Sequence, residues 1–154
     1  METLAASLIA VLGTLLGAGL THRFQVRATE RTERFARDER ARAERMDVYS
    51  AYAGALVNYR RALVDRWFRE HEDGPGEEVT AARMNGYELR SVVQEALFRV
   101  QMVAPDDKLV ELAREALHHI DQLHKAPDRD EMDARRDSTR ARITGFVSAA
   151  KETL

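Results

Sequence analysis

The chain has 154 residues, no cysteine and a formal net charge of −2. This length suits about one domain, and the lack of cysteine excludes a disulfide framework, thiolate metal ligands and a cysteine nucleophile. Ala, Leu, Arg and Glu are abundant and favour helices, and the three prolines lie between apolar periodic segments rather than within them. The sequence therefore predicts an all-α protein.

An uncharged apolar run at residues 4–20 opens the chain. As a helix, this run and its two flanking threonines would extend about 28 Å, close to the ~30 Å hydrocarbon core of a bilayer. The charge before it is Glu2, whereas a secretory signal peptide begins with positive charge. Arginines follow the run, so the positive-inside rule applies. We predict an uncleaved, single-pass transmembrane anchor at residues 1–21, with the N-terminus outside the cell membrane and the C-terminal body in the cytoplasm. A cleaved signal peptide and a buried soluble helix are the alternatives.

Small residues recur along one side of this predicted anchor. Gly13 and Gly17 form a GxxxG spacing, and Ala6 and Ala10 extend the row on nearly the same face. Such a row lets two helix backbones approach closely in lipid. These four residues are therefore the predicted helix-packing face, although Gly and Ala are also common in membrane helices without any pairing role.

A polar connector without proline or glycine follows at residues 22–45. Acidic residues often precede arginines by four positions, which stabilises an exposed helix. Phe24, Phe35 and Met46 recur at regular intervals that are compatible with a helical seam. A single solvated helix and a parallel coiled coil both remain open.

The first arginines of the connector, Arg23 and Arg27, follow the apolar run directly and are expected to face anionic lipid headgroups. The whole connector holds eight arginines, but five acidic residues interleave them. Little net field is left to attract a phosphate backbone, so the sequence does not predict nucleic-acid binding.

The remaining residues, 46–154, are predicted to fold as a cytoplasmic bundle of about four antiparallel helices, the first of them continuous with the connector. Apolar residues recur at three- and four-residue steps, and breakers at residues 74–76, Pro105 and Pro127 separate the periodic segments. The inward residues are expected to be Met46, Tyr49, Ala53, Leu56, Leu63 and Trp67; Val79, Ala82, Leu89, Val93, Leu97 and Val100; Leu109, Leu112, Ala116, Ile120 and Leu123; and Met132, Ile143, Phe146, Val147 and Ala150.

Asp106 and Asp128 lie where the last two helices are expected to begin, because acidic residues suit a helix N-terminus and Asp128 with Glu131 has the spacing of a capping box. Gly86 either weakens the middle of the second helix or permits close packing. The aromatic residues of the first helix have helical spacing and are expected in the core, with an exposed partner surface as the alternative; they are Tyr49, Tyr52, Tyr59, Trp67 and Phe68.

Several segments together resemble a known group of proteins. They are LLGAGLTHRF (15–24), the arginine ladder that ends at Arg45, DVYSAYAGAL (47–56) and GFVSAAKETL (145–154). In this layout the chain resembles uncharacterised actinobacterial single-pass membrane proteins. The resemblance implies an anchor, an Arg-rich helix and a small helical bundle, and it implies no activity. The chain is also similar in length and anchor position to the b subunits of ATP synthase, whose long helix would continue where this chain has breakers.

His71 lies among Glu70, Glu72 and Asp73 and is expected in a solvated loop. His118, His119 and His124 lie close together in the third expected helix. Glu115 and His118 have the E-x-x-H spacing of di-iron bundles, but the second such motif that a di-iron site needs is missing. No serine has a recognisable nucleophile context, and no phosphate-binding glycine loop occurs. We therefore predict no catalytic, cofactor-binding or metal-binding residue, and no cofactor.

The function that these features favour is a membrane-tethered, non-enzymatic protein-interaction or scaffold module. The alternative is an accessory subunit of a larger membrane protein complex, and a small metal-dependent enzyme is a third hypothesis. The expected partners are membrane lipid together with another protein or a second copy of the chain. The sequence does not indicate nucleic acid or a small-molecule substrate.

Overall fold

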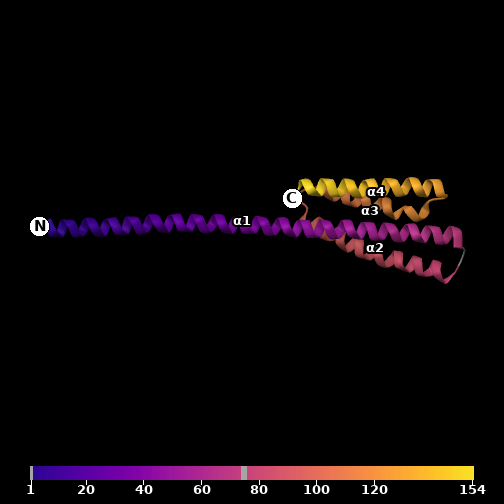
Figure 1. Cartoon of the computed structure of the whole chain (residues 1–154), viewed down its shortest axis with the longest axis horizontal. Helices are drawn as coiled ribbons and strands as arrows, with labels where there is room; N and C mark the ends of the chain where they lie inside the picture. Colours follow the sequence, from indigo (N-terminus) through magenta and orange to yellow (C-terminus); the bar gives the residue numbers. More distant parts are fainter. Residues whose placement is uncertain (1, 74–75) are drawn as a thin grey trace. The chain divides into compact units, whose positions relative to one another are not determined.

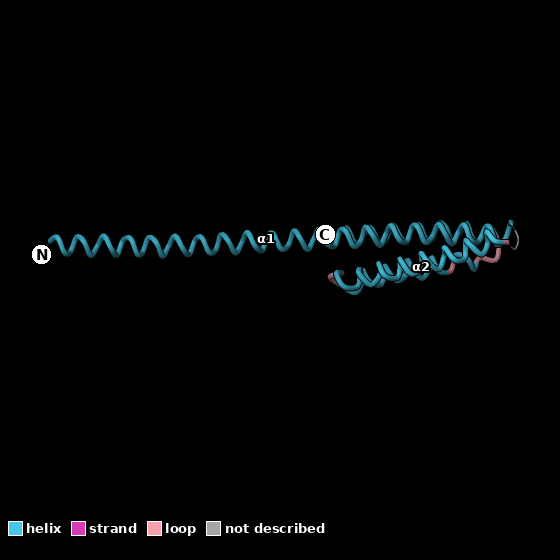
Figure 2. The backbone as a smooth tube through the Cα atoms, turned by 90° about the horizontal axis from the view of Figure 1, so that it is seen from below, coloured by secondary structure: helices cyan, strands magenta, loops and turns pink. Residues whose placement is uncertain are grey.

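The computed structural model describes the backbone of residues 2–73 and 76–154, and the side chains of residues 31–72 and 76–154. Every regular element in this part is a helix, and it contains no strand (Figure 2), as predicted. The elements are α1 (Glu2–Phe68), a π-helical turn (Arg69–Asp73), α2 (Glu77–Val103), α3 (Asp107–Asp121), a short 3₁₀ turn (Leu123–Lys125) and α4 (Arg129–Glu152), as Figure 1 shows.

The chain divides into two compact units, residues 1–42 and 43–154. In the first unit α1 is unbroken, because residues 22–42 lack proline and glycine and are rich in helix-forming Arg, Ala and Glu. Side chains 31–42 are almost all exposed, and Phe35 is 68% exposed. Within the described part, no helix is both long and apolar enough to cross a membrane. The spanning helix predicted at residues 1–21 is thus not supported by the structure, and the side chains of those residues lie outside the described part.

Residues 43–154 form an antiparallel four-helix bundle, and contacts between its helices establish their directions. At one end of the bundle, Arg69 pairs with Glu78 at 2.6 Å, and Glu70 pairs with Arg83 at 3.2 Å. Earlier in α1, Leu63 lies beside Gly86, which comes later in α2. The facing positions therefore fall in α1 as they rise in α2, so α2 runs antiparallel to α1. The first two helices of the bundle thus have the antiparallel arrangement that the sequence predicted.

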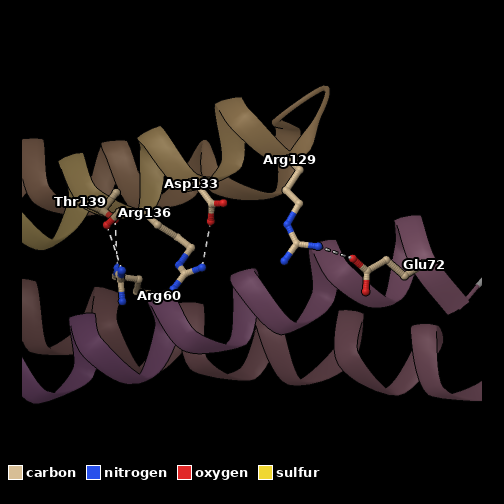
Figure 3. Close-up of polar contacts among 6 residues, drawn as sticks. All are labelled: Arg60, Glu72, Arg129, Asp133, Arg136 and Thr139. Carbon is tan, nitrogen blue, oxygen red and sulfur yellow. Dashed lines mark hydrogen bonds and ion pairs between the residues drawn. The ribbon is translucent and has the colours of Figure 1, made fainter.

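Helix α4 also runs antiparallel to the C-terminal part of α1. Arg60 donates hydrogen bonds to Thr139 Oγ1 at 3.0 Å and to the carbonyl oxygen of Arg136 at 2.9 Å (Figure 3). Beyond the end of α1, Glu72 of the π-helical turn pairs with Arg129 at 3.4 Å in the same view. The facing positions fall in α4 as they rise in α1, which places the first and last helices of the bundle side by side.

The core is continuous and involves all four helices. Tyr52, Leu56 and Phe146 are fully buried, and the rings of Tyr52 and Phe146 meet edge to face with centroids 5.1 Å apart. This geometry is favoured between aromatic rings. Most of the residues predicted to face inward are buried, namely Tyr49, Leu56, Leu63, Trp67, Val79, Ala82, Val93, Leu97, Val100, Leu109, Ala116, Ile120, Leu123, Met132, Ile143, Phe146 and Ala150.

Two residues predicted to face the core do not. Met46 is 49% exposed and Val147 is 46% exposed, because Tyr49 and Phe146 already close the core at that end of the bundle. Met46 and Val147 instead border an apolar hollow of about 290 Å³ beside Leu154. Ala53, Leu89 and Leu112, also predicted inward, are only partly buried.

Acidic side chains cap the last two helices, as their positions in the sequence predicted. Asp106 Oδ1 accepts a hydrogen bond of 2.9 Å from the Leu109 amide, and Asp128 Oδ1 accepts one of 2.9 Å from the Glu131 amide. Each bond satisfies a backbone donor that the first turn of a helix leaves free. The Glu131 carboxylate pairs with Arg135 at 2.7 Å, so only one of the two bonds of a capping box forms.

Candidate functional site

Helix α2 carries a row of exposed residues on the side opposite its buried ones. Met84 is 54% exposed, Tyr87 57%, Phe98 54% and Met102 76%. We call this row, together with the half-buried Gln94, the α2 face; it consists of Met84, Tyr87, Ser91, Gln94, Phe98 and Met102.

The helical period explains how one helix has two apolar sides. Val79, Ala82, Gly86, Val93, Leu97 and Val100 recur at three- and four-residue steps and are buried against the bundle. The α2 face recurs with the same steps but out of phase, so it points away from the core. Large apolar side chains held on a rigid helix in this way are typical of a docking surface.

The surface of the α2 face is hollowed at its centre. Tyr87 and Phe98 border a depression of about 490 Å³, together with Ser91, Gln94 and the charged residue Glu95. Arg90 also lines it. Aromatic walls with polar and charged residues between them offer both apolar contact and hydrogen bonding. All of the lining residues belong to α2, so the hollow is an open depression between the side chains of one helix.

A second, more polar cleft of about 340 Å³ adjoins this hollow and shares Tyr87 and Arg90 with it. At its base, Tyr59 donates a hydrogen bond of 2.7 Å to Asp121 Oδ1, and Arg90 Nε lies 3.5 Å from the same oxygen. Burial raises the pKa of Tyr59 well above its usual value, and the bond to Asp121 raises it further. Tyr59 therefore stays a hydrogen-bond donor, and Asp121 holds Arg90 at the edge of the α2 face.

His124 lies in this polar cleft, and its Nδ1 atom is buried without a hydrogen-bond partner in the described part of the chain. Burial lowers the pKa of His124, and the charges of Arg66 and Lys125 lower it further, although Glu70 and Asp121 oppose them. The imidazole is thus held neutral. Among the described residues that line this cleft, there is no serine, threonine or cysteine for a catalytic base to activate.

His118 and His119 do not assemble a metal site. The rings of His118 and His119 meet edge to face with centroids 5.7 Å apart, and Glu115 pairs with Arg142 at 3.1 Å. Burial lowers the pKa of His119, helped by Arg142 and His118 and opposed by Glu115. Within the described residues, no group of three or more potential ligands is placed to hold a metal ion.

His71 was expected in a solvated loop. It is exposed, but it belongs to the π-helical turn that prolongs α1. Its ring stacks on Trp67 with centroids 4.2 Å apart, and its Nδ1 lies 2.9 Å from the Trp67 carbonyl oxygen. The aromatic residues of this helix were predicted to pack in the core; Tyr49, Tyr52, Tyr59 and Trp67 are buried there, and Phe68 is partly buried against them.

The residues singled out near the N-terminus lie outside the described side chains. These are the predicted helix-packing residues Ala6, Ala10, Gly13 and Gly17, and the predicted headgroup-facing residues Arg23 and Arg27. Their roles stay predictions. The α2 face, by contrast, was not predicted. A signal was present, because Met84, Tyr87, Phe98 and Met102 have helical spacing on the side of α2 opposite its predicted core.

Fold and site together define a small four-helix-bundle protein with an exposed apolar helix face. Comparison with known proteins identifies its family. The family model of the KilB plasmid transfer protein matches residues 46–154, and the chain belongs to this family. It is 35% identical over 150 residues to Protein KilB of Streptomyces lividans, an alignment that covers 96% of each chain. No solved structure matches.

The relative comes from an actinobacterium, so the actinobacterial part of the predicted resemblance is confirmed. The membrane part of that resemblance is not supported by these comparisons.

Proposed function

We propose that this protein is a membrane-tethered, non-enzymatic docking module that acts in plasmid transfer. Membership of the KilB family supports the process. The observation that carries the docking role is the α2 face, where Tyr87 and Phe98 are each more than half exposed on a helix whose other side is buried. Aromatic and methionine side chains in such a position contribute strongly to protein interfaces.

The tether rests on the sequence. The apolar run at residues 4–20 has the length and lack of charge of a spanning helix, and Arg23 and Arg27 follow it on the side expected to face the cytoplasm. A tether confines the bundle to the vicinity of the membrane. Contacts that are weak in solution are then formed more often, because the effective concentration of the two surfaces is higher.

The experiment measures plasmid transfer between mating strains in which this chain is the family member that the plasmid carries. Phe98→Glu and Tyr87→Glu each place a charge on the α2 face. Either substitution is expected to lower transfer by at least about tenfold, since loss of a central aromatic residue typically costs 2 kcal/mol or more of binding. Both side chains are exposed, so the bundle should stay folded.

Ser148→Glu is the matched control, because Ser148 is exposed on α4 and lies outside the α2 face. It is expected to leave transfer unchanged. Thermal unfolding and cellular abundance of all three variants should match those of the unchanged chain. Normal transfer by the Phe98→Glu and Tyr87→Glu variants at normal abundance would overturn the proposed function.

A further inference from the structure

We propose that two copies of this protein pair in parallel through their α2 helices. The inference rests on the proposed function, because the membrane tether determines how two copies can approach each other. It goes further by naming the partner that the α2 face fits, which is a second copy of the same face.

The α2 face has the spacing of a coiled-coil seam. Met84, Ser91 and Phe98 occupy one set of seven-residue positions, and Tyr87 and Gln94 occupy the other. These are the a and d positions of a heptad, which meet their counterparts when two helices pair. In a parallel pair, Met84 would meet Met84 of the second copy, and Phe98 would meet Phe98.

Charges beside the seam select the parallel orientation. Arg83 and Arg90 take the g positions on one flank, and Glu88 and Glu95 take the e positions on the other. In a parallel pair each g residue faces the following e residue of the partner helix. Arg83 would then face Glu88 of the second copy, and Arg90 would face Glu95. An antiparallel pair would instead set the arginine flank against the arginine flank.

These side chains are accessible in the single chain. The side chain of Arg83 is 50% exposed, that of Arg90 58% and that of Glu95 67%, and Glu88 is exposed as well. Arg83 and Arg90 are partly fixed already, because they contact Glu70 and Asp121 within the bundle. Preorganised cations lose less side-chain entropy when they pair across an interface.

The order of the chain favours the same orientation if residues 4–20 anchor it. Parallel α2 helices place residue 43, where the bundle begins, at the same end of the pair in both copies. Antiparallel helices would place residue 43 of the two copies at opposite ends.

The pair should be weak without the tether. Ser91 and Gln94 are polar and lie at the centre of the seam, and polar residues at such positions fix register at a cost in stability. Confinement to a membrane compensates for this weakness by raising the effective concentration. We therefore expect pairing of the full chain in membranes.

Because the chain has no cysteine, a single introduced cysteine can link two copies only through its counterpart, and a product of twice the mass of the chain identifies that dimer. Met84→Cys in the full chain is oxidised in membrane vesicles from expressing cells. Efficient formation of a disulfide-linked dimer is expected. Ser148→Cys, on α4, is the matched control and should give at least about fivefold less, since its side chain lies off the seam.

Two further experiments test the orientation of the paired helices and the charge pairing between them. Vesicles that contain Met84→Cys and Met102→Cys chains together would form mixed dimers in an antiparallel pair, and these would overturn the parallel arrangement. Glu88→Arg should lower the Met84→Cys dimer fraction by about threefold through like-charge repulsion with Arg83 of the second copy. Adding Arg83→Glu should restore it, and a failure to restore it would overturn the charge pairing.

Transfer measurements separate this inference from the proposed function. If Met84→Cys dimers do not exceed the Ser148→Cys level but Phe98→Glu still abolishes transfer, self-pairing is wrong and the α2 face docks a different protein. If dimers form and Phe98→Glu prevents them without reducing transfer, the pairing stands and the proposed function is wrong.

Discussion

Tyr52 on α1 donates a hydrogen bond of 2.8 Å to the carbonyl oxygen of Ala113 on α3. Both residues are fully buried, and the bond joins two helices that are not consecutive in the chain. Burial raises the pKa of the Tyr52 hydroxyl, and the charge of Asp121 raises it further, so the group remains a donor. The bond therefore fixes the axial position of α3 against α1, and with it the position of Asp121 beside the α2 face.

Tyr52→Phe removes this bond and leaves the ring in place. We expect the free energy of unfolding to fall by about 1–2 kcal/mol, the usual loss for one buried hydrogen bond. Urea unfolding followed by circular dichroism measures it. Tyr87→Phe is the matched control because Tyr87 is 57% exposed, and it should change stability by less than about 0.5 kcal/mol. Equal effects of the two substitutions would contradict a special role for the Tyr52 bond.

Gly86 is buried in α2 opposite Leu63. The sequence left two readings of this glycine, a weak point in the helix or a site of close packing. A Cβ atom at Gly86 would lie 3.5 Å from Leu63 Cδ2, which is ordinary van der Waals contact. Gly86→Ala should therefore gain helix propensity without a clash and stabilise the protein by roughly 0.5–1 kcal/mol. Lower stability in urea unfolding would show instead that the packing of α1 on α2 requires glycine.

The neutral histidines predict that mild acid destabilises the bundle. Burial and nearby cations lower the pKa values of His124 and His119 below their ordinary value of 6.5. The unfolded chain then binds protons more readily than the folded chain, so stability is fully present above about pH 6.5 and falls as the pH falls below it.

His124→Gln should reduce the fall in stability between pH 7 and pH 5, as measured by urea midpoints at several pH values. Ser148→Gln, at an exposed position of α4, is the control; it changes no titratable group and should leave the pH profile unchanged. Glu70 adds to acid sensitivity at lower pH. Burial would raise its pKa, but hydrogen bonds from Arg66 and Arg83 outweigh burial and lower it below 4.5. An identical pH profile for His124→Gln would contradict the assignment to His124.

Local signals in the sequence predicted the helices well. Asp106 and Asp128 were expected at helix starts, and both cap the first turn. Such features depend on residues three positions apart, so the sequence displays them directly. The aromatic residues Tyr52 and Trp67 were likewise assigned to the core by their spacing, and both are buried.

The spacing of residues along the sequence does not predict contacts between distant parts of the chain. Arg60 interrupts the apolar stripe of α1, and its hydrogen-bond partner Thr139 lies 79 positions away. The exposed apolar side that contains Phe98 and Met102 was not predicted, because other apolar residues of α2 already formed a complete core-facing stripe. Which of two apolar sides is buried depends on the bundle as a whole, not on α2 alone.

The central claim is that a tether and the α2 face together make the protein work. Its most direct test is plasmid transfer by chains in which residues 1–22 are replaced with an unrelated single-span helix of the same orientation. We predict that residues 23–154 alone transfer poorly, that the foreign anchor restores transfer, and that the foreign anchor combined with Phe98→Glu does not. Full transfer by residues 23–154 alone, or by the anchored Phe98→Glu chain, would contradict the account.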